Sequence, residues 1–516
     1  MSIRRIKQYP FPRNLDSPES ISTYLQSLYR ALQEEATERI VDFSLLEMAD
    51  VPWVDVRTYG AKGDGETDDT KAIQAAIDSL KVNGGNYTKG AFQYRYSLGR
   101  GGGLIYFPPN YTFLTSAPLS VETDHSDTSN RMFADNIVLY GPGATLKAAS
   151  TFTGASRYYD ASNTETINAM VILGIKSYGK YPGHYQTYNS IIGLAFDGVD
   201  VTATDLSAIR GDVVLYPLIT DCIFADLHKA IDGRVISLAT ISGCRATYVN
   251  SFYCAINNSE ALGWNSGQGL DSGGPKITDV IVHFSKNTSN DAQYTSLGKI
   301  HLNNVGEELV ENVKIMGGGG KGIYRDRTAT TYQHSRWGHY NNVEIAGIYY
   351  HAVHIKNMQQ INFANCQFIW NQAQTHDSTA RPIVYLEDVK RIQMSNISID
   401  QNCSPASYNC GQLIALKGGG CIFTGIQAFG LPDADNTYGA ITIQDGSAGY
   451  EGDHNIFTGV EAGNTYYTAG NQFKYGIWEG AGVDSNIYSN TMTLNCATAG
   501  TNIVGAASLN TNNISV

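Results

Sequence analysis

The chain has 516 residues and a formal net charge of −12, and its bulk properties exclude several broad classes of protein. Hydrophobic residues make up 42% and charged residues only 16%, which is too apolar for a disordered chain. An acidic surface repels phosphates, so we expect no nucleic-acid partner. The 53 Gly and 33 Tyr favour an all-β protein with many turns.

The first residues, MSIRRIKQYPFPRN, are basic but reach Pro10 and Pro12 before any apolar segment. This pattern is not that of a signal peptide. No window is apolar for long enough to span a membrane, so we expect no membrane insertion. The sequence predicts a chain that is made in a cytoplasm and released by another route, such as lysis.

Residues 1–50 are predicted to form a separate N-terminal helical segment. Ser17 can cap a helix that has Pro18 at its first position. The apolar positions that follow have the spacing of a short coiled-coil seam: Ile21, Leu25, Leu28 and Leu32. Two interpretations stay open, a helix packed on its own chain and an oligomerisation stalk.

The segment from Val56 to Leu80, VRTYGAKGDGETDDTKAIQAAIDSL, predicts Gly-rich turns and then a helix over about 69–80. Asp69 or Thr70 would cap this helix, which shows one apolar face. Two short apolar strands ending in Gly/Pro turns come next, GGGLIYFPPNYTF and NIVLYGPGATL. Their glycines lack the Gly-Lys-Ser/Thr of a phosphate-binding loop, so we interpret them as structural.

This stretch resembles a known family. The motifs Asp64-Gly65 and Thr67-Asp68-Asp69-Thr70, followed by GGGLIYFPP, are similar to the N-terminal signature of the pectate-lyase-like right-handed parallel β-helices. Within that superfamily the chain resembles bacteriophage tailspikes and tail-associated depolymerases. The resemblance implies that the helix caps the open end of a solenoid spanning 51–516. It also implies a virion-associated homotrimer that acts on a polysaccharide, with the acidic residues of the signature serving turns and caps.

The solenoid repeat can also be derived from residue spacing. Eight segments recur at intervals of roughly 20 to 35 residues, the range of solenoid coils. They begin at Gly193, Asp221, Gly243, Asp279, Asn312, Asn342, Asn365 and Asn396. The second residue of each points into the core, because side chains alternate across a strand. We expect one buried column containing Cys222, Cys244, Val313, Val343, Cys366 and Ile397, and a stack of the leading Asn residues in a turn.

The eight cysteines give no sign of a metal site. Those of the repeat are expected to be small buried core residues. Cys403 and Cys410 flank a short loop, and the sequence leaves open whether they pair. No CxxC pair occurs, so we expect no metal and no cofactor.

The outward residues of these segments are unusually apolar. They are Ile223, Ala225, Ile281, Met316, Ala346 and Ile369. A water-facing sheet rarely exposes so many apolar groups. We expect a neighbouring subunit to cover this face in a parallel homotrimer, with a long covering loop as the alternative.

A second strand follows many of the segments, and its outward residues predict a polar and aromatic strip. They are Asp232, Asn257, His301, Tyr324, His354 and Tyr385. Coils stack about 4.8 Å apart, so the strip would be continuous. Aromatic rings and hydrogen-bonding side chains in a line suit an extended glycan, whereas a self-stabilising surface ladder is the alternative.

Charged residues are expected beside the strip on successive coils, in the order Asp326, Lys356, Glu387 and Lys417. Alternating signs predict a salt-bridge ladder, but two carboxylates near an aromatic strip are also what glycoside hydrolysis needs. Asp326 and Glu387 would lie two coils, about 10 Å, apart, which favours an inverting pair. The candidate catalytic carboxylates are Asp232, Asp326, Glu344 and Glu387, of which Glu344 follows a polar loop directly.

Two polar excursions, at 325–340 and 371–382, interrupt the coils and are expected to wall the strip. Arg with Trp in the first excursion would suit an acidic sugar, whereas packing on a neighbouring subunit is the alternative. The predicted substrate-binding residues are His301, Tyr324, Arg327, His334, Arg336, Trp337, His354, Trp370 and Tyr385.

The leading hypothesis is therefore a polysaccharide hydrolase with a carboxylate acid/base pair. A β-eliminating lyase is the alternative, with its base and cation among Lys314, Arg327 and His334, although no tight acidic cluster for calcium occurs. A non-catalytic glycan-binding appendage is the third hypothesis. The glycan, the stereochemical outcome, and whether the groove lies within one chain or between chains stay open.

Overall fold

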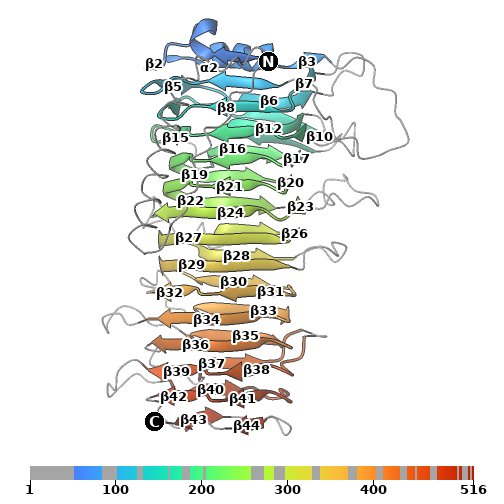
Figure 1. Cartoon of the computed structure of the whole chain (residues 1–516), viewed down its shortest axis with the longest axis vertical. Coiled ribbons are helices and arrows are strands. Elements are labelled where there is room, and N and C mark those ends of the chain that lie inside the picture. The colour runs from blue at the N-terminus through green and yellow to red at the C-terminus, as the bar shows by residue number, and fades with distance from the viewer. Residues whose placement is uncertain are drawn as a thin grey trace, which may run out of the picture. The chain divides into compact units, whose positions relative to one another are not determined.

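The structure, a computed structural model, describes residues 52–83, 102–124, 132–160, 163–176, 186–201, 205–256, 272–283, 297–327, 337–369, 381–401, 411–430, 439–447, 450–464, 473–494, 496, 499–502, 509–511 and 514–515. Strand makes up 63% of it and helix 4%. Nearly every strand pairs in parallel with strands of the preceding and following coils (Figure 1). The predicted all-β, right-handed parallel β-helix is confirmed. Among these residues no helix is long and apolar enough to cross a membrane.

Each coil contributes to three parallel ladders. In one coil the chain leaves the third ladder after Asn303, turns a corner at Glu307, and enters the first ladder. It bends at Asn312 into the second ladder and returns to the third at Lys321. The three ladders therefore form three outward faces around one core.

The strands of the first ladder are β1 (Trp53–Asp55), β4 (Gly103–Tyr106), β8 (Ile137–Tyr140), β14 (Ser190–Ile192), β18 (Leu218–Thr220), β21 (Thr240–Ser242), β24 (Lys276–His283), β27 (Glu308–Gly318), β29 (Gly338–Ile348), β31 (Ile361–Ala364), β34 (Gln393–Asp400), β36 (Ile422–Gly430), β38 (Ile456–Thr458), β41 (Ile487–Ser489) and β44 (Leu509–Thr511). Several of these continue into the second ladder, whose further strands are β2 (Asp64–Asp68), β5 (Thr112–Thr115), β9 (Thr145–Ala148), β15 (Ala195–Asp197), β19 (Ile223–Gly233), β22 (Arg245–Ile256), β32 (Gln367–Ile369), β39 (Glu461–Asn464), β42 (Met492–Leu494) and β45 (Ile514–Ser515).

The third ladder contains the ends of β19 and β22 together with β6 (Leu119–Asp124), β12 (Ala169–Lys176), β16 (Ser207–Asp212), β25 (Gly298–Asn303), β28 (Lys321–Asp326), β30 (Val353–Lys356), β33 (Val384–Lys390), β35 (Ile414–Gly419), β37 (Gly439–Gln444), β40 (Tyr475–Glu479) and β43 (Ala499–Asn502). Short strands outside the ladders are β3 (Val82–Asn83), β7 (Met132–Phe133), β10 (Ala155–Asp160), β11 (Asn163–Ile167), β13 (Gln186–Thr187), β17 (Val214–Leu215), β20 (Ile236–Ser237), β23 (Ser272–Gly273) and β26 (Val305–Gly306).

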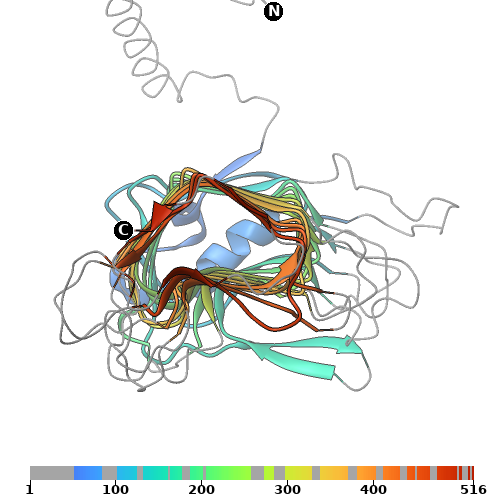
Figure 2. The same cartoon turned by 90° about the horizontal axis from the view of Figure 1, so that it is seen from below.

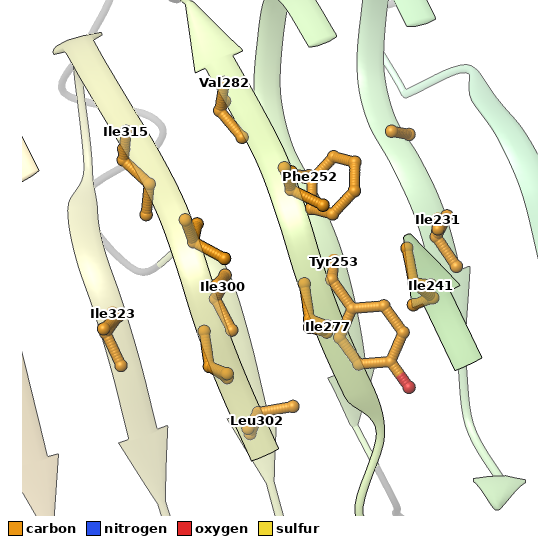
Figure 3. Packing of buried hydrophobic residues seen from close by; sticks show 14 of the residues in the cluster. Ile231, Ile241, Phe252, Tyr253, Ile277, Val282, Ile300, Leu302, Ile315 and Ile323 are labelled. Carbon is orange, nitrogen blue, oxygen red and sulfur yellow. The ribbon is translucent and has the colours of Figure 1, made fainter. Parts of the chain in front are cut away.

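Inward side chains of successive coils stack into one continuous core. Figure 3 shows part of it, where Ile231, Tyr253, Ile300 and Ile323 follow one another in the third ladder. Fully burying a side chain of this size contributes about 1.5–3 kcal/mol. Repetition of this term from coil to coil explains why the solenoid does not depend on any single layer.

The predicted buried column is confirmed. Its six members are each at most 1% exposed: Cys222, Cys244, Val313, Val343, Cys366 and Ile397. Val280 fills the one coil that the prediction omitted, between Cys244 and Val313. The three cysteines are free thiols.

The bend between the first and second ladders also matches its prediction. Asn312, Asn342, Asn365 and Asn396 all have left-handed backbone with φ between 52° and 55°. Their amides bond from coil to coil, with Asn342 donating to Asn312 at 2.8 Å and Asn396 to Asn365 at 3.1 Å, whereas Asn365 donates to the neighbouring Asn341 at 3.0 Å. Asn tolerates this backbone better than most residues, so the choice of residue follows from the bend.

The predicted capping helix is α2 (Thr70–Ser79), which buries one apolar face. Figure 2, seen along the coils, shows it across their N-terminal end. The expectation that Asp69 caps α2 is wrong for its side chain, which makes no cap hydrogen bond. The buried carboxylate of Asp69 instead accepts from the N–H groups of Lys62 and Gly63 at 2.6 and 2.9 Å, while Asp68 bonds the first helical N–H at 3.0 Å. The Asp69 carboxylate bonds to the turn at Lys62 and Gly63 and not to α2, because the N–H groups of that turn would otherwise lack a partner.

Antiparallel pairs interrupt the parallel pattern at β3–β7, at β6–β7 and in the hairpin β10–β11. Strands β10 and β11 pair antiparallel and pack on the outward side of β12 through a small apolar cluster that includes Ile167, Ile172 and Val213. Glu165 of the hairpin pairs with Arg234. Figure 2 shows the hairpin standing out from the side of the coils. Ile172 precedes Arg210 in register, so the hairpin covers the N-terminal end of the third face.

The six outward apolar residues lie on the second face, but in two adjoining columns. Ile223 and Ile281 share one column with Arg245, Lys314 and Glu344. The other column contains Ala225, Met316, Ala346 and Ile369. Ile223 is 50% exposed in the single chain, and the other five are partly buried. The segment 1–50 and the pair Cys403 and Cys410 lie outside the described residues, so their predictions remain predictions.

Candidate active site

The predicted strip is present as one column on the outward side of the third ladder. From the N-terminal to the C-terminal coils it runs Arg210, Asp232, Cys254, His301, Tyr324, His354 and Tyr385. Cys254 takes the place expected for Asn257, which lies outside the described residues. The error arose because β22 is one unbroken strand from Arg245 to Ile256, with no turn to mark where the third ladder begins.

The four rings of the strip stack continuously. Ring centroids are 4.7 Å apart between His301 and Tyr324, 5.1 Å between Tyr324 and His354, and 4.8 Å between His354 and Tyr385. The ring of His351 lies 5.0 Å from that of His354. Each such contact contributes about 0.5–1.5 kcal/mol beyond its buried area, so the strip is rigid as well as aromatic.

The N-terminal part of the column is a closed ion network. Arg210 donates to Asp232 at 2.5 Å and to Asp212 at 2.9 Å, and Lys229 donates to Asp232 at 2.9 Å. Burial alone would raise the pKa of Asp232, but the charges of Arg210 and then Lys229 hold it at about 2. Asp232 is only 9% exposed. The carboxylate of Asp232 is therefore ionised, ion-paired and buried, which fits a structural role rather than the predicted catalytic one.

Cys254 and His301 continue this closed part of the column. The Cys254 thiol lies 3.9 Å from Nδ1 of His301, and both side chains are buried. Burial raises the pKa of Cys254 to about 12 and lowers that of His301 to about 3. Both groups are thus neutral near neutral pH. Further along the strip Tyr324 and Tyr385 are partly exposed, whereas His354 is buried.

Glu387 is held beside the accessible part of the strip. Its carboxylate lies 3.3 Å from Nε2 of His354 and 3.3 Å from Nζ of Lys356. The hydrogen bond from His354, opposed by partial burial and aided by the charge of Lys356, lowers the pKa of Glu387 to about 2. Burial lowers the pKa of His354, so a neutral ring donates through Nε2–H to the carboxylate.

Asp326 occupies the same column as Glu387, two coils earlier. The expected order Asp326, Lys356, Glu387 and Lys417 on successive coils is confirmed. Asp326 lies 3.4 Å from the hydroxyl of Tyr324 and 3.4 Å from the amide of Asn357. The two carboxylates are thus separated by about 10 Å along the coils.

Lys321 is the site residue that sequence reasoning missed. Its Nζ lies 3.4 Å from the ring centroid of Tyr324. Burial lowers the pKa of Lys321 to about 8, and burial also raises the pKa of Tyr324 to about 12. Lys321 directly follows the bends at Gly319 and Gly320, where alternation along the strand starts afresh, so no periodicity could indicate its direction.

The predicted excursion residues have different positions. The carbonyl of Arg327 accepts from the amide of Asn357 at 3.2 Å. Trp337 is 54% exposed, and its indole N–H donates to Gln360 at 2.7 Å. His334, Arg336 and Trp370 lie outside the described residues. Arg325, which opens the first excursion, is fully buried in an ion pair with Glu308.

Glu344 is not brought to the strip. It lies in β29 on the second face, where it pairs with Lys314 at 2.8 Å. The sequence argument depended on a loop leading into its strand, but that strand enters the first and second ladders, and the strip lies on the third. The same pair removes Lys314 from the candidate lyase bases.

Comparison with known proteins supports the fold that the coils define, a right-handed parallel β-helix. Residues 53–224 match the family described as rhamnogalacturonase A/epimerase, pectate lyase-like. This match confirms the resemblance stated from the N-terminal motif, for that part of the chain.

Individual relatives carry less information. A stretch of 45 residues is 56% identical to alginate lyase 7 of Azotobacter vinelandii, covering 8% of this chain and 5% of that protein. The chain therefore matches only a small part of that curated relative.

Solved structures match over most of the chain. The A-module of the mannuronan C-5 epimerase AlgE6 of Azotobacter vinelandii has a TM-score of 0.51 and 14% identity, covering 90% of this chain and 99% of that one. Tailspike protein 3 of bacteriophage CBA120 has a TM-score of 0.56 and 12% identity, covering 94% and 68%. The pre-mature gene product 12 of bacteriophage phi29 has a TM-score of 0.52 and 13% identity, covering 94% and 58%. At these identities the likeness shows the fold alone.

Proposed function

We propose that this protein is a polysaccharide-processing enzyme that abstracts a proton from an anionic sugar at the accessible end of the strip, in a β-elimination or epimerisation. The observation that carries the proposal is Lys321, whose amine lies against the ring of Tyr324 with a pKa lowered to about 8. A fraction of this amine is neutral near neutral pH and can accept a proton. The names of the relatives, an alginate lyase and a mannuronan epimerase, are consistent with such chemistry.

The surroundings of Lys321 suit a sugar carboxylate. Lys356 and Lys417 lie two coils apart in the column beside the strip, with Glu387 between them, in a chain whose net charge is −12. A cation beside the sugar carboxylate favours loss of the neighbouring C–H proton, because negative charge builds up there in the transition state. In this proposal Lys356 binds the carboxylate of the reacting sugar, Lys417 that of a sugar further along the polymer, and the Tyr324 and Tyr385 rings support the sugar rings.

Tyr324 is the proton donor of the proposed elimination. Its pKa of about 12 keeps the hydroxyl protonated. In an elimination Lys321 takes the C5 proton, the C4–O bond breaks as the C4=C5 double bond forms, and Tyr324 donates to the departing glycosidic oxygen. In an epimerisation solvent water instead returns a proton to C5 from the opposite face of the sugar, and the Lys321 ammonium neutralises the hydroxide that is left. Asp326, 3.4 Å from the Tyr324 hydroxyl, orients that hydroxyl.

Hydrolysis is the second candidate, and the pair Asp326 and Glu387 favours it. Glu387, with a pKa of about 2, could serve only as base or nucleophile, which leaves Asp326 as the acid. Their separation of about 10 Å is slightly longer than an inverting pair uses and far longer than a retaining pair uses. For this reason proton abstraction replaces hydrolysis, which the sequence had favoured.

We also propose that the protein is a homotrimeric component of a phage tail. The likeness to two phage proteins, one of them a tailspike, supports this assignment. The exposed Ile223 on the second face is compatible with a subunit contact. A monomer in light scattering at micromolar concentration would contradict the trimer.

The function is tested by incubating the protein with sodium alginate, polygalacturonate and a panel of other acidic and neutral polysaccharides. Elimination produces unsaturated ends that absorb in the ultraviolet, epimerisation incorporates solvent deuterium at C5 without chain cleavage, and hydrolysis produces reducing ends without absorbance. The first two outcomes support the proposal. Hydrolysis, or binding without turnover as in an adhesin, would overturn it.

A further inference from the structure

The corner between the third and first ladders holds an unusual set of residues. In register from coil to coil, the part of this corner from Asn136 to Arg391 consists of Asn136, Tyr188, Tyr216, Leu238, Gly274, Glu307, Trp337, Gln360 and Arg391. Four of them are large apolar side chains that remain open to solvent. Tyr188 is 43% exposed, Tyr216 37%, Leu238 41% and Trp337 54%.

Three of these residues have backbone that does not suit them. Tyr188, Tyr216 and Leu238 have φ of 58°, 54° and 54°, in the left-handed region that favours Gly and Asn. The bend between the first and second ladders has the same backbone but uses Asn, Asp and Gly. Bulky residues at the corner therefore cost stability without a gain in core packing. Tyr248 at another bend has the same backbone, so a single residue of this kind does not mark a site, but three on consecutive coils at one corner point to a function.

The side chains are also ordered rather than loose. The rings of Tyr188 and Tyr216 stack 5.2 Å apart with planes 11° from parallel. Trp337 is held by its indole bond to Gln360, and its carbonyl accepts from Arg325 at 3.3 Å. Arg325 lies on β28 between the site residues Tyr324 and Asp326, so Trp337 is tied directly to the strand of the active site.

We propose that this corner, from Trp337 to Tyr188, is a second polysaccharide-binding track that extends the active site toward the N-terminal coils. Trp337 and Tyr188 are five coils apart, about 24 Å. The track is one side chain wide, which fits a single polymer chain. It is too narrow for a stable protein interface, which needs about 800 Å² from each partner. Aromatic rings with polar tips suit a ligand that offers both C–H faces and hydroxyls.

The inference rests on the proposed function, since its ligand is the polysaccharide that the active site processes. Contacts so far from the reacting sugar bind long chains equally in the ground state and the transition state. They therefore lower KM for polymer without changing kcat. Short oligosaccharides bound at Lys321 cannot reach the far end of the corner at Tyr216 and Tyr188, four and five coils beyond Trp337, and should not sense it.

The test compares the double variant Tyr188→Asn/Tyr216→Asn with Tyr248→Asn. Tyr248 is a matched control, because it is 47% exposed with φ of 57° but lies at another bend. Asn suits the left-handed backbone, so both proteins should keep or raise their Tm. With long-chain alginate, or polygalacturonate if that is the polymer turned over, the double variant should raise KM about tenfold at unchanged kcat. Turnover of tetrasaccharides should be unchanged, and Tyr248→Asn should behave as wild type with both substrates.

Other outcomes separate this inference from the proposed function. Normal KM for polymer in the double variant, with Tm unchanged or raised, overturns the track and leaves the active site standing. If no polysaccharide is turned over, retardation of the protein in alginate-containing native gels shows whether it binds the polymer at all. Retardation lost only in the double variant supports a binding track without the enzyme, and no retardation of wild type overturns both. A change of oligomeric state by light scattering would assign the corner to a subunit contact and overturn the track.

Discussion

The two halves of the third face carry similar residue types but behave differently. In the N-terminal half, Arg210 and Asp232 neutralise each other and are covered, next to the hairpin β10–β11. In the C-terminal half, Lys321 and Tyr324 stay partly exposed, and the charges of Lys356 and Glu387 lie at the surface. A charged group in a solenoid column is therefore not evidence for a site by itself. Partial exposure of Lys321 and Tyr324 distinguishes the half that can do chemistry, since Asp326 there is as buried as Asp232.

Lys321→Ala tests the open half and should have the largest effect. Loss of the base should lower kcat on the processed polysaccharide by about 10²–10⁴-fold, with little change in Tm. Lys276→Ala, at an exposed lysine on the first face, is the matched control and should leave kcat unchanged. Because the neutral amine is the active form, wild-type kcat should rise with pH to a plateau above about 8. A flat profile between pH 6 and 9 would contradict the assignment.

Arg210→Ala tests the closed half. It leaves Asp232 and Asp212 without their shared partner in a buried place, so the free energy of unfolding should fall by about 3–5 kcal/mol. Glu387→Gln, in the open half, should cost less than about 1 kcal/mol, since its ion pair is partly exposed. Urea unfolding measures both. Equal losses in the two variants would erase the distinction between the halves.

Asp232 should make the closed half sensitive to acid. Its folded pKa of about 2 lies below that of an unfolded aspartate, about 3.9. Its contribution, about 2 kcal/mol, is therefore fully present above pH 5 and is lost as the pH falls toward 2. Asp232→Asn should lower stability at pH 6 and show a shallower decline between pH 5 and 2. Parallel stability curves for wild type and variant would show that Asp232 is not the group responsible.

The smallest effect concerns the bend between the first and second ladders. Asn342→Ala forces Ala into backbone with φ of 52° and breaks one amide ladder bond, so it should cost about 1–2 kcal/mol. Asn342→Gly keeps the backbone free and should cost less. The difference between the two variants, measured by Tm, isolates the backbone term. Equal Tm values would mean that the side-chain ladder alone stabilises the bend.

Sequence reasoning reached the fold because its signals are local and repeated. The alternation around Val313 and Val343 recurs from coil to coil, and so does an Asn, Asp or Gly at the bend. An error of register in one coil would therefore conflict with the coils beside it. Where the repeat was irregular the reasoning failed. Asn257 was placed in the strip where Cys254 lies, because β22 runs unbroken from the second ladder into the third and no turn residues mark the change. Asp69 was assigned to the helix, although the turn at Lys62 and Gly63 takes its carboxylate.

The sequence by itself determined the coils, the buried column and the order of residues along the strip. Each of these follows from the period of a strand and the stacking of equivalent positions. Only the tertiary structure decided which strip residues are covered, that Glu344 belongs to another face, and that Lys321 lies over Tyr324. Burial and charge pairing depend on neighbours from other coils and from the hairpin, and no spacing within one strand encodes those distances.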